Sequence, residues 1–193
     1  MASENTKVAN QAASNEVAAN AVSEAVAELT DIMSYDEARY LGVGKLESTQ
    51  IELMNIGITK LDESTNPTEK SVQYIGQKSK SNKVTGYDNQ FSIESDLIKN
   101  EKVVEDIYDV LYYRKTGVEA QRYLYLVDLW KPVEEKTGVY KARKLKVSIV
   151  LSSKASTPGE TITFSGDLKG IGDFEYGTFD VATKTFTKTD TTS

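Results

Sequence analysis

The sequence contains neither histidine nor cysteine in its 193 residues. Without these side chains it cannot build Ser-His-Asp or Cys-His catalytic sites, Cys/His zinc sites or disulfides. No apolar run approaches the ~20 residues that span a bilayer, and the N-terminus lacks the basic and leucine-rich regions of a secretory signal. These absences favour a non-enzymatic protein with no cofactor and no membrane partner, made in the cytoplasm.

The net charge of −6 is unevenly placed along the chain. Residues 1–33 hold five acidic side chains against a single lysine, Lys7, for a balance of −4. The other 160 residues are close to neutral at −2. The main domain therefore shows no basic patch of the kind that follows a nucleic-acid backbone.

Residues 1–34 differ in composition from the rest of the chain, because they are rich in Ala, Asn, Glu and Val and contain no Gly or Pro. Apolar or small residues recur there at alternating spacings of four and three, from Val8 to Met33, which predicts an amphipathic helix over roughly Ser14–Met33. This segment is either a mobile extension with partial helix or a helix docked on its own domain or a neighbour. A coiled coil is disfavoured because Ala and Asn bury little apolar area.

After residue 34 the pattern changes to short β-strands with one helix. The helix is predicted over Lys99–Lys115, with Asn100 as its cap and Gly117 as its stop. The polar, aperiodic stretch Gln77–Asp88 predicts a long exposed loop. Strands are predicted at Gln50–Met54, Gly57–Leu61, Ser71–Ile75, Gln90–Glu94, Arg122–Trp130, Lys144–Ser152, Thr161–Ser165, Phe174–Phe179 and Lys184–Thr187.

These elements predict an α+β fold that is mainly antiparallel β. The expected arrangement is two packed sheets, as a sandwich or open barrel, with one flanking helix and an N-terminal Ala-rich helical extension. The expected divisions are the extension at 1–34, the β domain at 35–187 and a frayed tail at 188–193.

Two groups of carboxylates are candidates for a chemical site. Asp173, Glu175 and Asp180 could offer oxygen ligands to calcium, but their spacing matches no known calcium loop. Glu94 and Asp96 share one strand face about 7 Å apart and could form a glycosidase pair, although nothing else indicates a sugar cleft. The sequence therefore predicts no catalytic, cofactor or metal site.

The order of several short motifs points to one family. Phe91-Ser92-Ile93-Glu94-Ser95-Asp96 leads into a helix that ends Arg114-Lys115-Thr116-Gly117, and an aromatic strand follows at Tyr123–Trp130. Phe164-Ser165-Gly166-Asp167 and Gly177-Thr178-Phe179-Asp180 come later. From about Tyr35 to Thr187 this order resembles the major tail (tail tube) proteins of long-tailed bacteriophages; residues 1–34 lie outside the resemblance.

The resemblance implies a structural subunit that forms hexameric rings, stacked as a hollow tube in the virion tail after assembly in the host cytoplasm. It implies contacts with further copies of the chain and with neighbouring tail proteins. Viral DNA would pass through the lumen during genome ejection without specific binding. One alternative is the inner tube of a contractile phage tail or bacteriocin-like injection particle, and another is a β-sandwich adhesin or carbohydrate-binding module.

The resemblance and the strand pattern together suggest two sets of candidate site residues. Glu94, Asp96 and Asp128 are expected to face the lumen and repel phosphates; the alternative is that they form salt bridges between subunits or meet solvent. The predicted loop is expected to be mobile in the free subunit and ordered at a contact between rings. Its candidate contact residues are Gln77, Lys78, Lys80, Lys83, Tyr87 and Asp88.

Overall fold

The computed structural model describes residues 30–46 and 50–189. The chain divides into two units, residues 1–34 and 35–193. The helix predicted for the first unit lies almost wholly outside the described residues, so the fold is that of the second unit. Among the described residues, no helix is long and apolar enough to cross a membrane.

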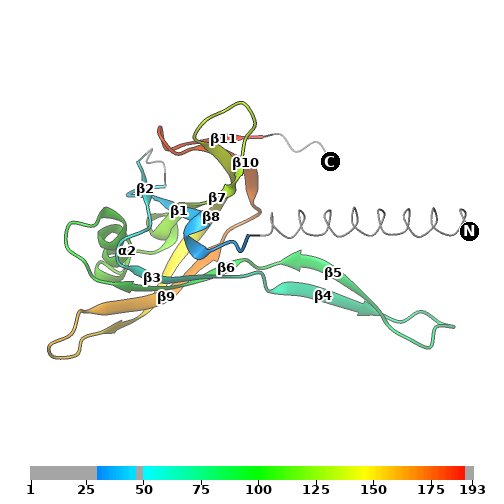
Figure 1. Cartoon of the computed structure of the whole chain (residues 1–193). Coiled ribbons are helices and arrows are strands. Elements are labelled where there is room, and N and C mark those ends of the chain that lie inside the picture. Colours follow the sequence, from blue (N-terminus) through cyan, green and yellow to red (C-terminus); the bar gives the residue numbers. More distant parts are fainter. Residues whose placement is uncertain (1–29, 47–49, 190–193) are drawn as a thin grey trace, which may run out of the picture. The chain divides into compact units, whose positions relative to one another are not determined.

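Eleven strands, one α-helix and two short 3-10 helices make up the described part of the chain (Figure 1). The α-helix is α2 (Lys102–Tyr112), and the 3-10 helices are η1 (Ser34–Asp36) and η2 (Gly117–Ala120). The strands are β1 (Glu37–Gly42), β2 (Ile51–Leu53), β3 (Ile58–Ser64), β4 (Pro67–Val72), β5 (Ser81–Tyr87), β6 (Gln90–Asp96), β7 (Gln121–Pro132), β8 (Val139–Ala155), β9 (Thr163–Gly170), β10 (Glu175–Asp180) and β11 (Thr185–Lys188).

Nine of these strands form one antiparallel sheet. Seven of them follow the order β2-β1-β7-β8-β9-β6-β3, and β10 and β11 lie off this path. The long strand β8 organises it: β10 pairs with its first part, at residues 139–144, and β9 with its last part, at residues 147–155. β11 pairs with β10 alone, and β4 and β5 form a separate two-stranded sheet. The mainly antiparallel fold is confirmed, but the prediction of two packed sheets is corrected, because the strands around the core belong to a single hydrogen-bonded sheet.

Side chains alternate across this sheet and build a core on each face. On β7, Leu124 and Leu126 join the larger core, which the buried side of α2 completes with Val104 and Ile107. Tyr125 and Val127 point to the other face, into a smaller core. This two-sided burial explains why the sequence of β7 does not alternate between apolar and polar residues. The smaller core also contains Tyr40, Ala142 and Phe179, and the rings of Tyr40 and Phe179 lie 4.6 Å apart.

A buried ion pair fixes α2 to the start of β7. The Arg122 guanidinium, 1% exposed, donates from Nε to one Asp106 oxygen at 2.6 Å and from Nη2 to the other at 2.9 Å. Its Nη1 donates to the backbone carbonyls of Glu119 and Gln121. Because the guanidinium is hydrogen-bonded through all three of its nitrogens, this charge is tolerated in the core.

The predicted helix is confirmed over Lys102–Tyr112, three residues shorter at each end than predicted, but its cap and its stop are not, since Tyr113 and not Gly117 is its C-cap. Glu101, not Asn100, stands at the N-cap, and no side-chain hydrogen bond caps the helix. Asn100 has a left-handed φ of 66°, and its backbone N–H donates to the Glu105 carboxylate at 2.8 Å. The backbone turn before the helix therefore places the Asn100 side chain too early to cap it.

The predicted strands all have a counterpart in the structure, with ends shifted by three residues or more at β3, β4, β8 and β9. The prediction of a loop throughout Gln77–Asp88 is wrong, because Ser81–Tyr87 is strand β5. The sequence pattern did not predict β1. The predicted frayed tail begins too early: Lys188 pairs with Gly177 as the last residue of β11, and residues 190–193 lie outside the described part.

Candidate interaction surfaces

An open polar face runs across β3, β6 and β9. Phe91 and Ile93 are 1% exposed and point into the larger core, as predicted. Glu94 and Asp96 therefore lie on the opposite face of β6. The strand register adds Asp62 of β3 and Asp167 of β9 to this face, since both lie directly across from Ser92.

The polar side chains of this face are linked to one another. Lys60 Nζ lies 3.4 Å from a Glu94 oxygen and 3.6 Å from Asp62. The hydrogen bond and charge of Glu94 raise the pKa of Lys60. Ser92 Oγ donates to Asp167 at 3.3 Å. The face thus carries more acidic than basic side chains. Sequence reasoning missed Asp62 and Asp167 because their place on the same face as Glu94 depends on the register of distant strands.

Asp128 does not belong to this face. It follows Leu124 and Leu126 on the core side of β7, beyond the point where the core ends. There it accepts a hydrogen bond from Lys131 Nζ at 2.9 Å, and its side chain is 13% exposed. The structure therefore separates Asp128 from Glu94 and Asp96, on opposite faces of the sheet, so the three predicted acids cannot line one common surface of the sheet.

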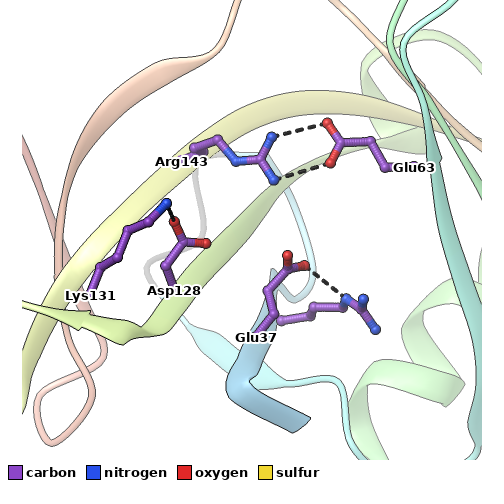
Figure 2. Close-up of polar contacts among 6 residues, drawn as sticks. Glu37, Glu63, Asp128, Lys131 and Arg143 are labelled. Carbon is purple, nitrogen blue, oxygen red and sulfur yellow. Dashed lines mark hydrogen bonds and ion pairs between the residues drawn. The ribbon is translucent and has the colours of Figure 1, made fainter. Parts of the chain in front are cut away.

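The surroundings of Asp128 are a set of paired charges at the end of the larger core, shown in Figure 2. Arg143 on β8 makes two hydrogen bonds to Glu63 on β3, at 3.0 and 3.1 Å. Glu37 accepts one from Arg39 Nε at 3.1 Å. Each carboxylate here has a local cation, so this end of the sheet is electrically compensated within one subunit.

The hairpin β4–β5, here called the arm, extends β3 and β6 beyond the body of the domain (Figure 1). It is joined to them by Thr65–Asn66 and Asp88–Asn89, where the Asp88 N–H donates to the Thr65 carbonyl at 3.1 Å. Nearly all of its side chains are exposed. None of the buried core residues comes from the arm.

The arm contains five of the six residues predicted for contacts between rings, and Asp88 lies in its joint. Gln77, Lys78 and Lys80 lie in the tip that connects the strands, while Lys83 and Tyr87 are on β5. All six are exposed. Lys70, on β4, stands directly across from Lys83; sequence reasoning missed it because the predicted strand began too late in the chain.

Two of the three carboxylates considered as a calcium site, Glu175 and Asp180, have protein partners. Glu175 lies 2.9 Å from Lys144 and 3.3 Å from Lys188, and the hydrogen bond from Lys144 chiefly lowers its pKa. Asp180 accepts hydrogen bonds from the backbone N–H groups of Thr183 and Ala182, which lower the pKa of its carboxyl group. Within residues 30–46 and 50–189, no three potential ligands gather as a metal site.

No protein-family model and no curated protein matches the chain. Among solved structures, a chain from the tail of an empty gene transfer agent particle with C6 symmetry is 9% identical with a TM-score of 0.50, over 76% of this chain and 98% of that one. A chain of the native gene transfer agent virion is 11% identical with a TM-score of 0.46, over 76% and 98%. A chain of the sixfold-symmetrised anti-feeding prophage baseplate is 8% identical with a TM-score of 0.46, over 77% and 96%.

The described domain is thus a half-closed antiparallel β domain with one covering helix and a projecting hairpin. It shares its fold with the matched chain from the gene transfer agent tail, nearly the whole of which aligns with it. The resemblance recognised in the sequence is confirmed at the level of fold. At 9% identity the match shows the fold alone.

Proposed function

We propose that this chain is a non-enzymatic structural subunit that assembles with copies of itself into hexameric rings, stacked as a hollow tail tube through which a genome is ejected. The observation that carries the proposal is the fold match to a chain in the tail of a C6-symmetric particle. The tube belongs to a virion tail, assembled in the host cytoplasm and joined at its ends to other tail proteins. Neither a reaction nor a cofactor is part of this role.

The strand order supports self-assembly. β2 and β3 end the order of the sheet, so each presents one strand edge without a partner inside the described domain. Unpaired edges bind further strands unless they are protected, and a closed ring satisfies such contacts in every subunit at once. β3 carries the exposed charges Lys60, Asp62 and Glu63, which restrict pairing to partners with a matching surface.

We assign the open polar face of β3, β6 and β9 to the lumen. An excess of carboxylates there, with Asp62 and Asp167 on either side of Ser92 and Glu94 two residues further along β6, repels passing phosphates and prevents tight DNA binding. Asp96 shares the face. Asp128 pairs with Lys131 at the end of the larger core. It is therefore not assigned to the lumen, where the sequence had placed it.

Negative-stain microscopy of the purified protein at high concentration tests the central proposal. Rings or tubes with sixfold symmetry and an open bore are expected. A compact monomer at every concentration and salt condition would contradict it. A particle reconstruction with a sheath around the tube would assign the chain to a contractile tail, while a bare tube would assign it to a long non-contractile one.

The lumen assignment has its own test. Changing Glu94→Lys and Asp167→Lys together should leave tube formation intact but retain DNA in the tube and reduce genome delivery. Asp128→Lys is the matched control on the other sheet face and should not retain DNA. If the Glu94 and Asp167 changes block tube formation, these residues lie at an interface and the lumen assignment is wrong.

A further inference from the structure

The arm concentrates positive charge. Residues 70–87 contain Lys70, Lys78, Lys80 and Lys83 and no Asp or Glu, whereas the whole chain has a net charge of −6. Among the described residues, none of the four takes part in an ion pair. Lys70 and Lys83 are direct partners across the two strands. Like charges in that position destabilise a hairpin, so an external anion would stabilise the arm.

The arm also exposes apolar side chains that its own fold does not cover. Tyr74 and Tyr87 are 64% and 65% exposed, and Ile75 in the tip is fully exposed. Val84 lies across from Glu69, the single acidic residue on the two strands, on the face opposite Lys70 and Lys83. A two-stranded hairpin without a covered face is marginal in water. The matching partner therefore offers carboxylates together with apolar side chains.

The N-terminal segment of the chain has this chemistry. Residues 1–33 carry Glu4, Glu16, Glu24, Glu28 and Asp31 against Lys7, a net charge of −4. Val17, Val26 and Leu29 each lie within two positions of one of these acids in the sequence. At the end of the larger core, Glu37, Glu63 and Asp128 are already paired with cations. That end of the body therefore offers no excess of carboxylates.

We propose that the arm of one subunit binds the acidic segment, residues 1–33, of a neighbouring copy. This inference rests on the proposed function, since it requires copies to stand side by side in an assembly. The four lysines meet the five acids of the segment, while Tyr74, Ile75 and Tyr87 cover its valines and leucine. Each subunit gives one segment and receives another, so every copy in a closed ring or stack has both contacts filled.

Charge reversal in the full chain tests this contact. Lys78→Glu, Lys80→Glu and Lys83→Glu together should lower the fraction of protein that sediments as tubes about tenfold. Glu16→Lys, Glu24→Lys and Glu28→Lys together should do the same. Combining all six changes should restore assembly to near the wild-type level, because the attraction is rebuilt with opposite signs. The matched control is Lys99→Glu, Lys115→Glu and Lys136→Glu on the body, which should leave assembly unchanged.

Unchanged tubes in the arm variant, or no recovery in the combined variant, would overturn the inference and leave the proposed function standing. Absence of tubes in the wild-type protein would overturn both. An arm variant that loses only DNA co-sedimentation, with normal tubes, would assign the lysines to nucleic acid and overturn the contact between copies.

Cross-linking identifies which copy supplies the segment. The chain has no cysteine, so Lys80→Cys and Glu24→Cys provide unique thiols. Tubes assembled from an equal mixture of the two single variants should give a disulfide-linked dimer on oxidation, and Lys136→Cys mixed with Glu24→Cys should not. A Lys80→Cys/Glu24→Cys variant that closes a disulfide only within one chain, when diluted into cysteine-free subunits, would show that the segment binds its own arm and would overturn the proposal.

Discussion

The body and the arm of this domain are stabilised in different ways. In the body, strands from distant parts of the sequence pack against one side of α2 and bury Arg122 with its carboxylate partner. In the arm, the strands are neighbours in sequence, contribute nothing to either core and place Lys70 against Lys83. A two-stranded hairpin without a covered face is marginal in water on its own. On the proposals made above, the body accounts for folding and the arm for assembly, and variants in one region, with controls in the other, can break that division.

The largest expected effect on stability comes from Asp106→Ala in the body. Arg122 would then remain buried without its carboxylate, at a cost of about 3–5 kcal/mol in the free energy of unfolding. Urea denaturation of the unassembled subunit measures this. Lys83→Ala in the arm is the control and should change stability by less than about 0.5 kcal/mol.

A double variant separates the loss of the pair from the loss of packing. Asp106→Leu with Arg122→Met removes both charges and keeps apolar volume, so it should be more stable than Asp106→Ala alone. If the double variant is less stable than Asp106→Ala, the ion pair itself stabilises the helix. The loss in Asp106→Ala would then not come from leaving Arg122 buried without a partner.

The same division decides what the sequence could reveal. The apolar stripe of α2 and the alternation in β8 are local patterns, and both elements are predicted from the sequence. β5 is not, because Ser81–Tyr87 is exposed on both faces and leaves no hydrophobic period to detect. β1 is not predicted for the opposite reason: Tyr40 and Leu41 are both buried, each in a different core. The strand therefore has no alternation of apolar and polar residues to detect.

The candidate lumen acids show the same limit. The sequence places Glu94 and Phe91 on opposite faces of β6, because strand alternation is local. It could not place Asp167 beside Ser92 on the face of Glu94, or set Asp128 on the other side of the sheet, since both depend on the register of strands far apart in the chain. The order of the motifs along the sequence identified the fold. Which residues share a surface could be known only once the pairing of the strands was known.

A smaller loss is expected where two strands approach closely in the body. A β-carbon at Gly166 would clash with the Val150 carbonyl oxygen and lie 2.6 Å from Cα of Leu151. Gly166→Val should therefore cost about 2–3 kcal/mol by parting β8 from β9. At Gly86 in the arm, nothing lies within 4 Å of such an atom, so Gly86→Val should leave the unfolding midpoint nearly unchanged. Equal losses at the two positions would show that the arm is packed against the body.

The pH dependence of the body should expose a weaker contribution from Glu52. Hydrogen bonds from Lys102, then Lys184 and Gln50, hold the pKa of Glu52 at about 2, below the ordinary 4.5. A lowered folded-state pKa stabilises the protein above pH 4.5, and this contribution is lost as the pH falls toward 2. Glu52→Gln should cost about 1 kcal/mol at pH 7, after allowance for solvent screening, and almost nothing near pH 2. Glu69→Gln in the arm is the control, because Glu69 is exposed and forms no ion pair among the described residues, and it should change stability at pH 7 by less than about 0.5 kcal/mol.

The smallest effect on stability, and the largest on assembly, is expected from removing the arm. Deleting residues 67–87 joins Asn66 to Asp88, whose backbones are already in hydrogen-bond contact, and leaves Thr65-Asn66-Asp88-Asn89 as a four-residue turn between β3 and β6. Since no core residue is lost, the melting temperature of the subunit should fall by no more than a few degrees. Tubes should not form, because the charged and apolar contacts of every copy are removed together. A deletion variant that unfolds would show that the arm belongs to the folding unit, and one that still assembles into tubes would show that the edges of the sheet suffice; either result would break the division of roles between body and arm.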